Sequence, residues 1–377
     1  MQTKRFGLCA ALSAAELLLL AGCAGSGSTA APTLTVESSH PLQYAKQFTV
    51  DECTGGYELI TIADSQYLVV PQGAAVPEDL PQGTTVLQQP IENIYLVSTS
   101  AMDPIISLGA LDSIALSGTK ADGWYLPKAK AAMQAGQIAY AGKYSAPDYE
   151  TILASGCGLA IENTMIYHTP EVKEQLEKFG IPVLVERSSY ETDPLARMEW
   201  VKLYGILLGK KQEAEQLFDT QVQRVAPLEN QQPTGKTVAF FSITSNNLVT
   251  VRKGSDYVAR MIEMAGGSYV FDDLTDSGNN LATINLSLED FYAGAKDADV
   301  LLYNSTIEGS IASTEQLVEK CPLLAQFKAV QNGNVWCTAQ SLFQQSMELP
   351  DLILDMNRVF TEGTPADSEL TFLTHVE

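Results

Sequence analysis

Histidine and cysteine are scarce in this chain of 377 residues, which contains three histidines and six cysteines. His40, His168 and His375 lie far apart, so the sequence has no histidine cluster of the type that binds a bare Zn²⁺ or Mn²⁺ ion. The catalytic patterns GxSxG and HExxH are missing as well. The stretch that ends in PTGKT has Asn230 where a phosphate-binding loop requires its first glycine. We therefore expect no metal ion held by protein ligands and no enzymatic activity.

Basic residues are also few, with 23 lysines and arginines against 45 aspartates and glutamates, and the formal net charge is −22. Such an acidic surface repels phosphate backbones and anionic lipid head groups. The composition therefore argues against a nucleic-acid partner. The hydrophobic content of 45% is sufficient for a large core, and the length of the chain indicates two domains.

Near its start the sequence has an apolar run that is shorter than the roughly 20 residues a membrane-spanning helix needs. This run, residues 6–20, contains Glu16 and follows two basic residues. A basic start, a short apolar run and the small residues Ala21-Gly22 are typical of an export signal. The pattern predicts a signal peptide over residues 1–22.

The tetrapeptide Leu20-Ala21-Gly22-Cys23 resembles a bacterial lipobox. The resemblance implies a covalent lipid on Cys23, which would hold the protein at the extracytoplasmic face of the cell membrane. Small and polar residues over 23–35 suit a flexible tether behind this anchor. The alternative is a plain cleaved signal in which the cysteine is incidental.

The cysteines beyond the tether form no CxxC pair and no disulfide-rich pattern. Their spacing predicts free thiols buried in the core, and a disulfide between Cys321 and Cys337 is the alternative. These four cysteines are Cys53, Cys157, Cys321 and Cys337.

Strand and helix patterns alternate twice along the chain, which predicts an α/β protein with two Rossmann-like lobes of mostly parallel strands. A long segment with apolar residues at helical spacing bridges the two lobes, with a break near Gly209. The expected order is a strand ribbon (36–85) with two strands in 58–70, a first lobe (86–193), a bridging helix (194–228), a second lobe (236–345), and a C-terminal helix with a polar tail (346–377).

One local pattern occurs in both lobes: a capping residue, a glutamate two positions later, a short helix and a buried strand. Asp148 and Glu150 carry it in the first lobe, and Ser287 and Glu289 carry it in the second. A glutamate near a helix start is stabilised by the helix dipole, which is a sufficient structural reason for each. The occurrence of one glutamate in each lobe favours a paired surface role instead.

The lipobox at Cys23, the run PLARMEWVKLYG (194–205) and the two glutamate segments resemble the substrate-binding lipoproteins of ABC importers. More narrowly, they resemble the group that captures iron–siderophores, haem and cobalamin, over roughly residues 86–345. The resemblance implies a monomer with the ligand in a cleft between two lobes, and a permease dimer with its ATPase as partner. It also implies that Glu150 and Glu289 dock into arginine pockets of the permease.

The ligand would then be a metal complex such as a siderophore, haem or corrinoid, with no covalent group other than the lipid on Cys23. An iron-free organic anion stays open as well. An extracytoplasmic enzyme and a sensor ectodomain on the same scaffold are the alternatives to transport.

In open α/β sheets, ligands bind at the carboxyl ends of the strands, so the loops at those ends supply the candidate ligand contacts. Aromatic side chains there would give contact area, and arginines would bind carboxylates or chelate oxygens. A packing role is the alternative for each aromatic residue, and Arg252 could instead balance Asp256. The candidates are Met102, Trp124, Tyr125, Tyr144, Arg187, Tyr190, Asn246, Arg252 and Phe343.

Overall fold

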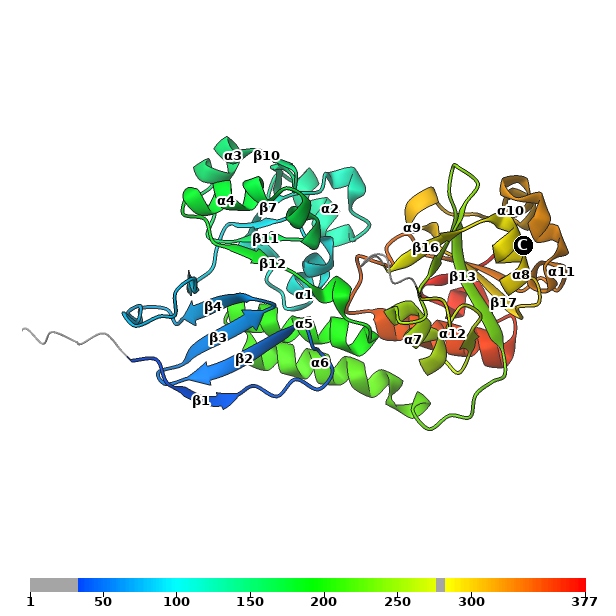
Figure 1. The fold of residues 1–377 in the computed structure, drawn as a ribbon, viewed down its shortest axis with the longest axis horizontal. Helices are drawn as coiled ribbons and strands as arrows, with labels where there is room; N and C mark the ends of the chain where they lie inside the picture. The colour runs from blue at the N-terminus through cyan, green and yellow to red at the C-terminus, as the bar shows by residue number, and fades with distance from the viewer. Residues whose placement is uncertain (1–32, 276–281) are drawn as a thin grey trace, which may run out of the picture.

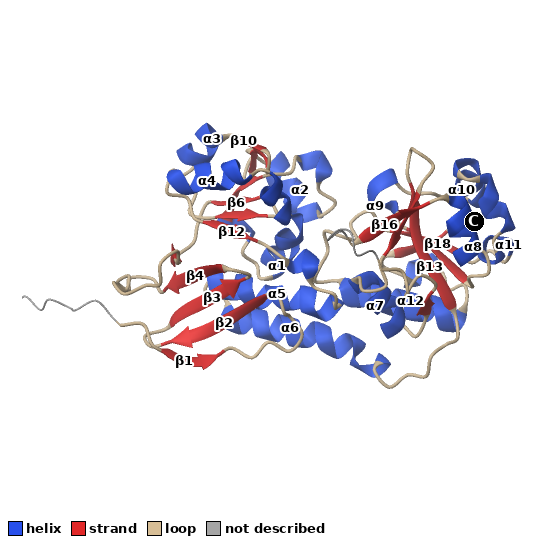
Figure 2. Cartoon of the chain, viewed as in Figure 1, coloured by secondary structure: helices blue, strands red, loops and turns tan. Residues whose placement is uncertain are grey.

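The computed structural model describes residues 33–275 and 282–377, so the predicted signal peptide and Cys23 lie outside the described residues. An N-terminal sheet, a first lobe, a pair of long helices and a second lobe follow one another along the chain (Figures 1 and 2). The expected α/β architecture with two lobes is confirmed. Among the described residues, the helices are too short or too polar to span a membrane.

The N-terminal region is larger than the ribbon that its sequence predicted. The two strands expected in 58–70 are present, but they lie within a sheet of order β1-β2-β3-β4-β5. One face of this sheet packs through Phe48 and Val50 into the main core, and Leu59 and Leu68 form a separate cluster on the other face. The strands are β1 (Val36–Ser39), β2 (Phe48–Cys53), β3 (Tyr57–Ile62), β4 (Ser65–Val70) and β5 (Thr85–Gln88).

The first lobe is a parallel sheet of order β12-β11-β6-β7-β8 with helices on both faces. Side chains alternate along β6, where Leu96 joins the main core with α1 and α2, and Tyr95 packs beneath α3 and α4. The strands are β6 (Ile94–Leu96), β7 (Ile114–Ser117), β8 (Ala139–Tyr140), β11 (Ala160–Glu162) and β12 (Val183–Val185), with a small hairpin of β9 (Gly142–Lys143) and β10 (Ala146–Pro147). The helices are α1 (Met102–Ser107), α2 (Pro127–Gln134), α3 (Tyr149–Ala154) and α4 (Pro170–Lys178).

The second lobe has a mixed sheet of order β16-β14-β13-β17-β18-β19, with β15 beside β13. The central strands β13, β17 and β18 are parallel to one another. Farther out, β14 pairs antiparallel with β13, β16 with β14, and β19 with β18. The strands are β13 (Thr237–Ile243), β14 (Val249–Arg252), β15 (Ser268–Tyr269), β16 (Thr283–Leu286), β17 (Val300–Tyr303), β18 (Val335–Thr338) and β19 (Leu373–His375). The helices are α7 (Tyr257–Met264), α8 (Leu288–Ala295), α9 (Ser305–Glu308), α10 (Thr314–Lys320), α11 (Lys328–Gln331) and α12 (Leu349–Glu362).

The expected polar tail is wrong, because the chain end contributes β19 to the second lobe. The Asp355 carboxylate of α12 accepts hydrogen bonds from the backbone N–H groups of residues 371–373, at 2.8, 2.6 and 3.2 Å. Phe372 and Leu373 are buried as a result. A carboxylate that binds three successive N–H groups fixes this strand at the edge of the sheet.

The bridging segment predicted over 194–228 is helical, but it folds back on itself at the predicted break. The segment forms two helices, α5 (Pro194–Leu207) and α6 (Lys211–Val225), and the predicted break at Gly209 is the point where the chain reverses. The two helices pack closely because Gly205 has no side chain: a Cβ atom there would lie 2.4 Å from the Cβ of Ala214.

Helix α5 is the axis of the molecule, because all its residues are buried. The N-terminal sheet, the first lobe and α6 surround it, and the Arg197 guanidinium stacks 4.2 Å from the ring centre of Tyr257 in the second lobe. Arg224 of α6 forms an ion pair with Asp351 of α12 on the second lobe. The helix pair therefore contacts both lobes, which favours a rigid connection.

Two buried glutamates attach the N-terminal segment to this axis. The Glu199 carboxylate accepts hydrogen bonds from the backbone N–H groups of residues 43–45 at 2.8 to 3.1 Å, and from the Lys202 ammonium at 2.8 Å. The Glu191 carboxylate accepts from the N–H groups of residues 46–47 at 2.9 to 3.1 Å. Five successive backbone donors are therefore bound by two carboxylates.

The lobes also touch directly. The Asp103 carboxyl group of α1 accepts a hydrogen bond from the backbone N–H of Met347 at 2.8 Å, and Ser346 Oγ lies 3.2 Å from the Ser100 carbonyl oxygen. Burial and the neighbouring Glu348 raise the pKa of Asp103. A protonated Asp103 avoids repulsion between the two carboxyl groups at this contact.

Glu162 is the last residue of β11, and Glu186 directly follows the neighbouring strand β12. The two carboxyl groups have opposite surroundings. Glu186 accepts hydrogen bonds from Ser98 and Ser100 at 2.9 Å each, and from the Ser188 N–H at 2.8 Å. Glu162 is fully buried, and neither of its carboxyl oxygens has a hydrogen-bond partner in the described part of the chain. Burial therefore raises the pKa of Glu162 to about 8.

Replacement of Glu199 tests the attachment of the N-terminal segment. Glu199→Gln places an amide N–H opposite backbone N–H donors, so we expect the free energy of unfolding to fall by about 3 kcal/mol. Urea denaturation measures this change. The control is Glu213→Gln on the exposed side of α6, which should change the value by less than about 0.5 kcal/mol. Equal stability of the two variants would contradict the assigned role of Glu199.

Glu162 predicts a pH dependence of stability. Its pKa is about 8 in the folded chain against an ordinary 4.5, so the unfolded chain ionises first as the pH rises. The free energy of unfolding should therefore fall between pH 4.5 and pH 8, and Glu162→Gln should remove this loss. The difference in the free energy of unfolding between the variant and the unsubstituted protein should grow by about 3 kcal/mol in favour of the variant from pH 5 to pH 8.5. This assignment is wrong if the free energy of unfolding from urea denaturation changes by the same amount in both proteins between the two pH values.

Candidate functional site

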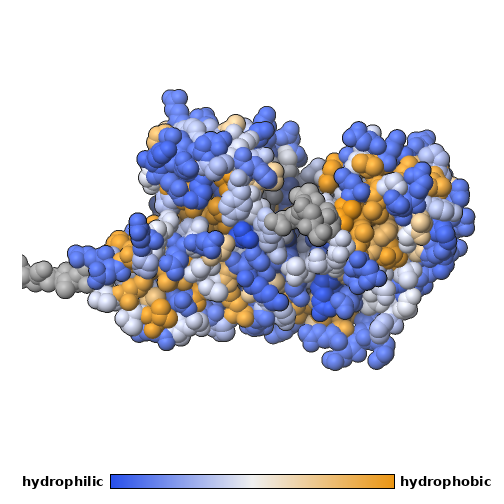
Figure 3. All heavy atoms as spheres, in the orientation of Figure 1, coloured by the Kyte–Doolittle hydropathy of each residue, from blue (hydrophilic) through white to orange (hydrophobic). Residues whose placement is uncertain are grey.

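A cavity of about 350 Å³ lies between the two lobes. Its walls follow the carboxyl end of β12 in the first lobe and the carboxyl end of β14 in the second. Figure 3 shows the molecule hollowed between the lobes. The lining residues are Arg187, Ser189, Tyr190, Glu191 and Thr192 from one side, and Lys253, Ser255, Asp256 and Ala282 from the other.

Cationic side chains gather at this cavity although the chain is strongly acidic. The Arg187 guanidinium lies 4.6 Å from the ring centre of Tyr190, and its Nη1 atom lies 3.4 Å from the Tyr167 hydroxyl. In the second lobe, the Arg252 guanidinium lies 4.5 Å from the ring centre of Phe343, and neither residue is among those that line the cavity. Lys253, the next residue, lines the cavity itself. Stacking on Tyr190 orients the Arg187 guanidinium without neutralising its charge. Arg252 instead lies 3.6 Å from the Asp256 carboxylate, which is the balancing role that the sequence offered as its alternative.

The carboxylates of the cavity are engaged by other groups. Glu191 binds the N–H groups of the N-terminal segment, as described above. Asp256 caps α7 by accepting a hydrogen bond from the Val258 N–H at 3.0 Å, and it lies 3.6 Å from the Arg252 guanidinium. The lining therefore has two cations, Arg187 and Lys253, beside two carboxylates that already accept backbone hydrogen bonds, which favours a ligand that presents anionic or oxygen acceptor groups.

Tyr125 lies at a contact between the two lobes. Its backbone N–H donates to the Gln344 side chain at 2.8 Å, and the Gln344 amide donates to the Gly123 carbonyl oxygen at 2.9 Å. The Tyr125 side chain is 44% exposed. The sequence had placed Tyr125 and Phe343 at one site, and the structure brings their loops together through Gln344.

Of the nine predicted ligand contacts, Arg187 and Tyr190 line the cavity. Tyr125, Arg252 and Phe343 do not line it, and the other four lie elsewhere. Met102 and Trp124 are buried in the core, and the Trp124 indole donates to Ser117 Oγ at 3.2 Å. Tyr144 packs against the cluster beneath α3 and α4. Asn246 is exposed in the turn between β13 and β14. Their loop positions predicted all four, but none of them lines the cavity.

Sequence reasoning missed Lys253, Ser255 and Thr192 as lining residues. Lys253 and Ser255 lie between the end of β14 and the start of α7. Because β14 is antiparallel to β13, this loop is not at the carboxyl edge of the parallel strands, where we expected ligand contacts. The sequence does contain one sign of this loop, because Asp256 is a typical capping residue and predicts that a helix starts directly after it.

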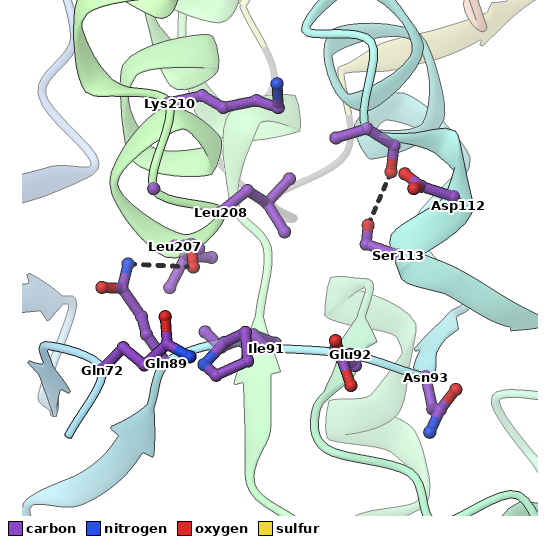
Figure 4. Close-up of a pocket in the computed structure, with 13 residues that line it drawn as sticks. Gln72, Gln89, Ile91, Glu92, Asn93, Asp112, Ser113, Leu207, Leu208 and Lys210 are labelled. Carbon is purple, nitrogen blue, oxygen red and sulfur yellow. Dashed lines mark hydrogen bonds between the residues drawn. The ribbon is translucent and has the colours of Figure 1, made fainter. Parts of the chain in front are cut away.

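A second cavity of about 470 Å³ lies at the other edge of the first lobe, beneath the amino ends of its strands (Figure 4). The Gln89 amide there donates to the Ile206 carbonyl oxygen at 2.8 Å. Its charged lining residues are Glu92, Asp112 and Lys210, so their charges oppose one another. This mixture gives a weaker reason for binding a charged ligand than the cavity between the lobes.

The two repeated glutamates take matching positions. Glu150 and Glu289 are the second residues of α3 and α8, and both are exposed. Asp148 and Ser287 cap these helices, each accepting a backbone hydrogen bond at 3.1 Å. The local equivalence that the sequence predicted is present in both lobes.

The cysteines of residues 33–275 and 282–377 are free thiols. Three are buried and Cys157 is half-buried, so the predicted thiols are confirmed and the alternative disulfide between Cys321 and Cys337 is not formed. In the same part of the chain, no three histidine, cysteine, aspartate or glutamate side chains are grouped closely enough to hold a metal ion.

The sequence is similar to that of an uncharacterized lipoprotein of Methanocaldococcus jannaschii. The two are 27% identical over 241 residues, which are 62% of this chain and 55% of the relative. The chain therefore spans about half the length of this curated relative.

Solved structures show the same fold. The periplasmic haem-binding protein HutB of Vibrio cholerae matches with a TM-score of 0.56 and 18% identity, over 73% of this chain and 99% of that one. A structure described as an ABC-type Fe³⁺-hydroxamate transport system from Saccharomonospora viridis matches with a TM-score of 0.55 and 21% identity, over 72% and 94%. Both agree with the two lobes seen here.

The sequence model of one family, described as periplasmic binding protein, matches residues 95–341. The match covers most of both lobes and the helix pair between them, and it contains the lining residues of the cavity between the lobes. The N-terminal sheet lies before it. The chain belongs to the periplasmic binding protein family.

Proposed function

We propose that this protein is a lipid-anchored solute-binding protein that captures a metal chelate or related organic ligand and delivers it to an ABC permease. The ligand class is a siderophore, haem or corrinoid that presents anionic or oxygen-rich groups. The observation that carries the proposal is that Arg187 and Lys253 line one cavity from opposite lobes, in a chain with a net charge of −22.

The size and lining of the cavity support a small-molecule ligand. Its volume of about 350 Å³ lies within the range of ordinary ligand pockets. Tyr190 supplies an aromatic face, and Arg187, which is stacked on it, presents donors that match carboxylate or chelate oxygens. Haem and Fe³⁺-hydroxamate appear in the names of the structural neighbours, which supports the same ligand class.

The sequence before the described residues supports the anchor. Leu20-Ala21-Gly22-Cys23 resembles a lipobox, and the Methanocaldococcus jannaschii relative is named a lipoprotein. A lipid on Cys23 would hold the monomer at the extracytoplasmic face of the membrane, beside its permease and ATPase.

The matching helix starts support delivery. Glu150 and Glu289 are exposed at equivalent positions, one in each lobe. A permease dimer presents two equivalent surfaces, so one acidic contact from each lobe fits its symmetry. Such charged contacts determine orientation and association rate more than ligand affinity.

Arg187 tests the ligand site. Haemin, ferrioxamine B and cyanocobalamin are titrated separately into the protein and followed by absorbance. We expect the unsubstituted protein to bind at least one of them and Arg187→Ala to bind it about tenfold more weakly. The control is Arg358→Ala, which removes an exposed arginine of α12. The proposed site is wrong if Arg187→Ala keeps full affinity for every probe that binds.

The paired glutamates test delivery. The double variant Glu150→Ala, Glu289→Ala should keep ligand affinity and melting temperature, while uptake and ligand-stimulated ATP hydrolysis fall at least about fivefold. The control double variant Glu174→Ala, Glu319→Ala also removes one exposed glutamate from each lobe. Equal uptake by the two double variants would leave only the helix-dipole role for Glu150 and Glu289.

A further inference from the structure

The N-terminal segment reaches the ligand cavity, although it lies before the residues that the family model matches. Residues 43–47 connect β1 to β2 and run along α5, bound by Glu191 and Glu199. At the end of this segment, the Gln47 side chain meets Arg187, which lines the cavity. A residue of the additional sheet therefore contacts the cation that we assign to ligand binding.

The contact holds the guanidinium from one edge. Gln47 Oε1 lies 3.4 Å from Arg187 Nε and 3.3 Å from Nη2, so one amide oxygen accepts from both donors. The Tyr190 ring packs against the face of the guanidinium, and the Tyr167 hydroxyl lies near Nη1. Three neighbours therefore restrict the position of the group.

The chemistry of Gln47 matters as much as its position. A carboxylate at the same place would also orient Arg187, but it would neutralise the charge that an anionic ligand needs. An amide oxygen accepts the hydrogen bonds and carries no net charge. Gln47 therefore orients the guanidinium and leaves its charge available.

The backbone of Gln47 is itself fixed. Its N–H donates to Glu191 Oε1 at 2.9 Å, and the same oxygen accepts from the Trp200 indole at 3.1 Å. The next residue, Phe48, is buried with its ring centre 4.8 Å from that of Trp200. The attachment of the N-terminal sheet to α5 thus places Gln47 beside Arg187.

We propose that Gln47 is a positioning residue of the ligand site: it holds the Arg187 guanidinium toward the cavity, where no carboxylate of residues 33–275 or 282–377 forms an ion pair with it. The additional N-terminal sheet then takes part in anion recognition besides its packing on α5. This inference rests on the proposed function, because it assumes that Arg187 contacts the ligand.

The first experiment compares Gln47→Ala, Gln47→Glu and the control Gln43→Glu by titration with haemin, whose two propionates are anionic. Gln43 is exposed in the same segment, so the control adds the same charge without facing Arg187. We expect affinity to fall about fivefold for Gln47→Ala and about thirtyfold for Gln47→Glu, with no change for Gln43→Glu. The deficit of Gln47→Glu should shrink as salt is raised, which a purely structural loss would not do.

The second experiment needs no ligand. Phenylglyoxal modifies accessible arginine side chains, and peptide mass spectrometry measures the rate at Arg187. We expect Gln47→Ala to raise this rate severalfold and Gln43→Glu to leave it unchanged. The inference is overturned if Gln47→Ala changes neither the Arg187 rate nor haemin affinity while Arg187→Ala abolishes haemin binding. Failure of the unsubstituted protein to bind haemin, ferrioxamine B or cyanocobalamin would instead count against the proposed function, and the phenylglyoxal rates would still decide whether Gln47 holds Arg187.

Discussion

Two buried carboxylates, Glu191 and Glu199, bind five successive backbone N–H groups of residues 43–47. A buried carboxylate is costly unless donors surround it, and a buried backbone N–H is costly unless it has an acceptor. The carboxylates therefore supply the acceptors that the backbone N–H groups need, and the N–H groups supply the donors that the carboxylates need. The N-terminal sheet can cover α5 because its connecting segment supplies the donors that these glutamates need.

The remaining architecture follows from a helix that is buried on every side. Helix α5 carries Arg197, Glu199 and Lys202 in the interior, and each has partners. Arg197 donates to a backbone carbonyl oxygen and stacks on an aromatic ring. Glu199 accepts from three backbone N–H groups and from the Lys202 ammonium. Contacts on all sides place the N-terminal sheet and both lobes around one axis. The cavity lies where the loops before α5 and α7 face each other, so the packing of α5 also determines the spacing of the candidate ligand contacts.

The features that could be predicted from the sequence are those set by residues close together in the chain. Alternating strands and helices gave the two lobes, the helix caps at Asp148 and Ser287 were found, and Arg187 and Tyr190 lie at the expected cavity. Burial of loop side chains could not be predicted, because Trp124 enters the core through contacts distant in sequence. The reversal after α5 depends on the approach of Gly205 to Ala214, and β19 depends on Asp355, so neither has a short sequence signature.

The most direct test of the account is a crystal structure of the protein with the ligand that it retains when purified from its own cells. The account predicts electron density for that ligand between the lobes, with its acceptor oxygens near Arg187 and Lys253. Density for the ligand in the cavity beside Gln89 and Lys210, with the space between the lobes holding only water, would contradict the central claim.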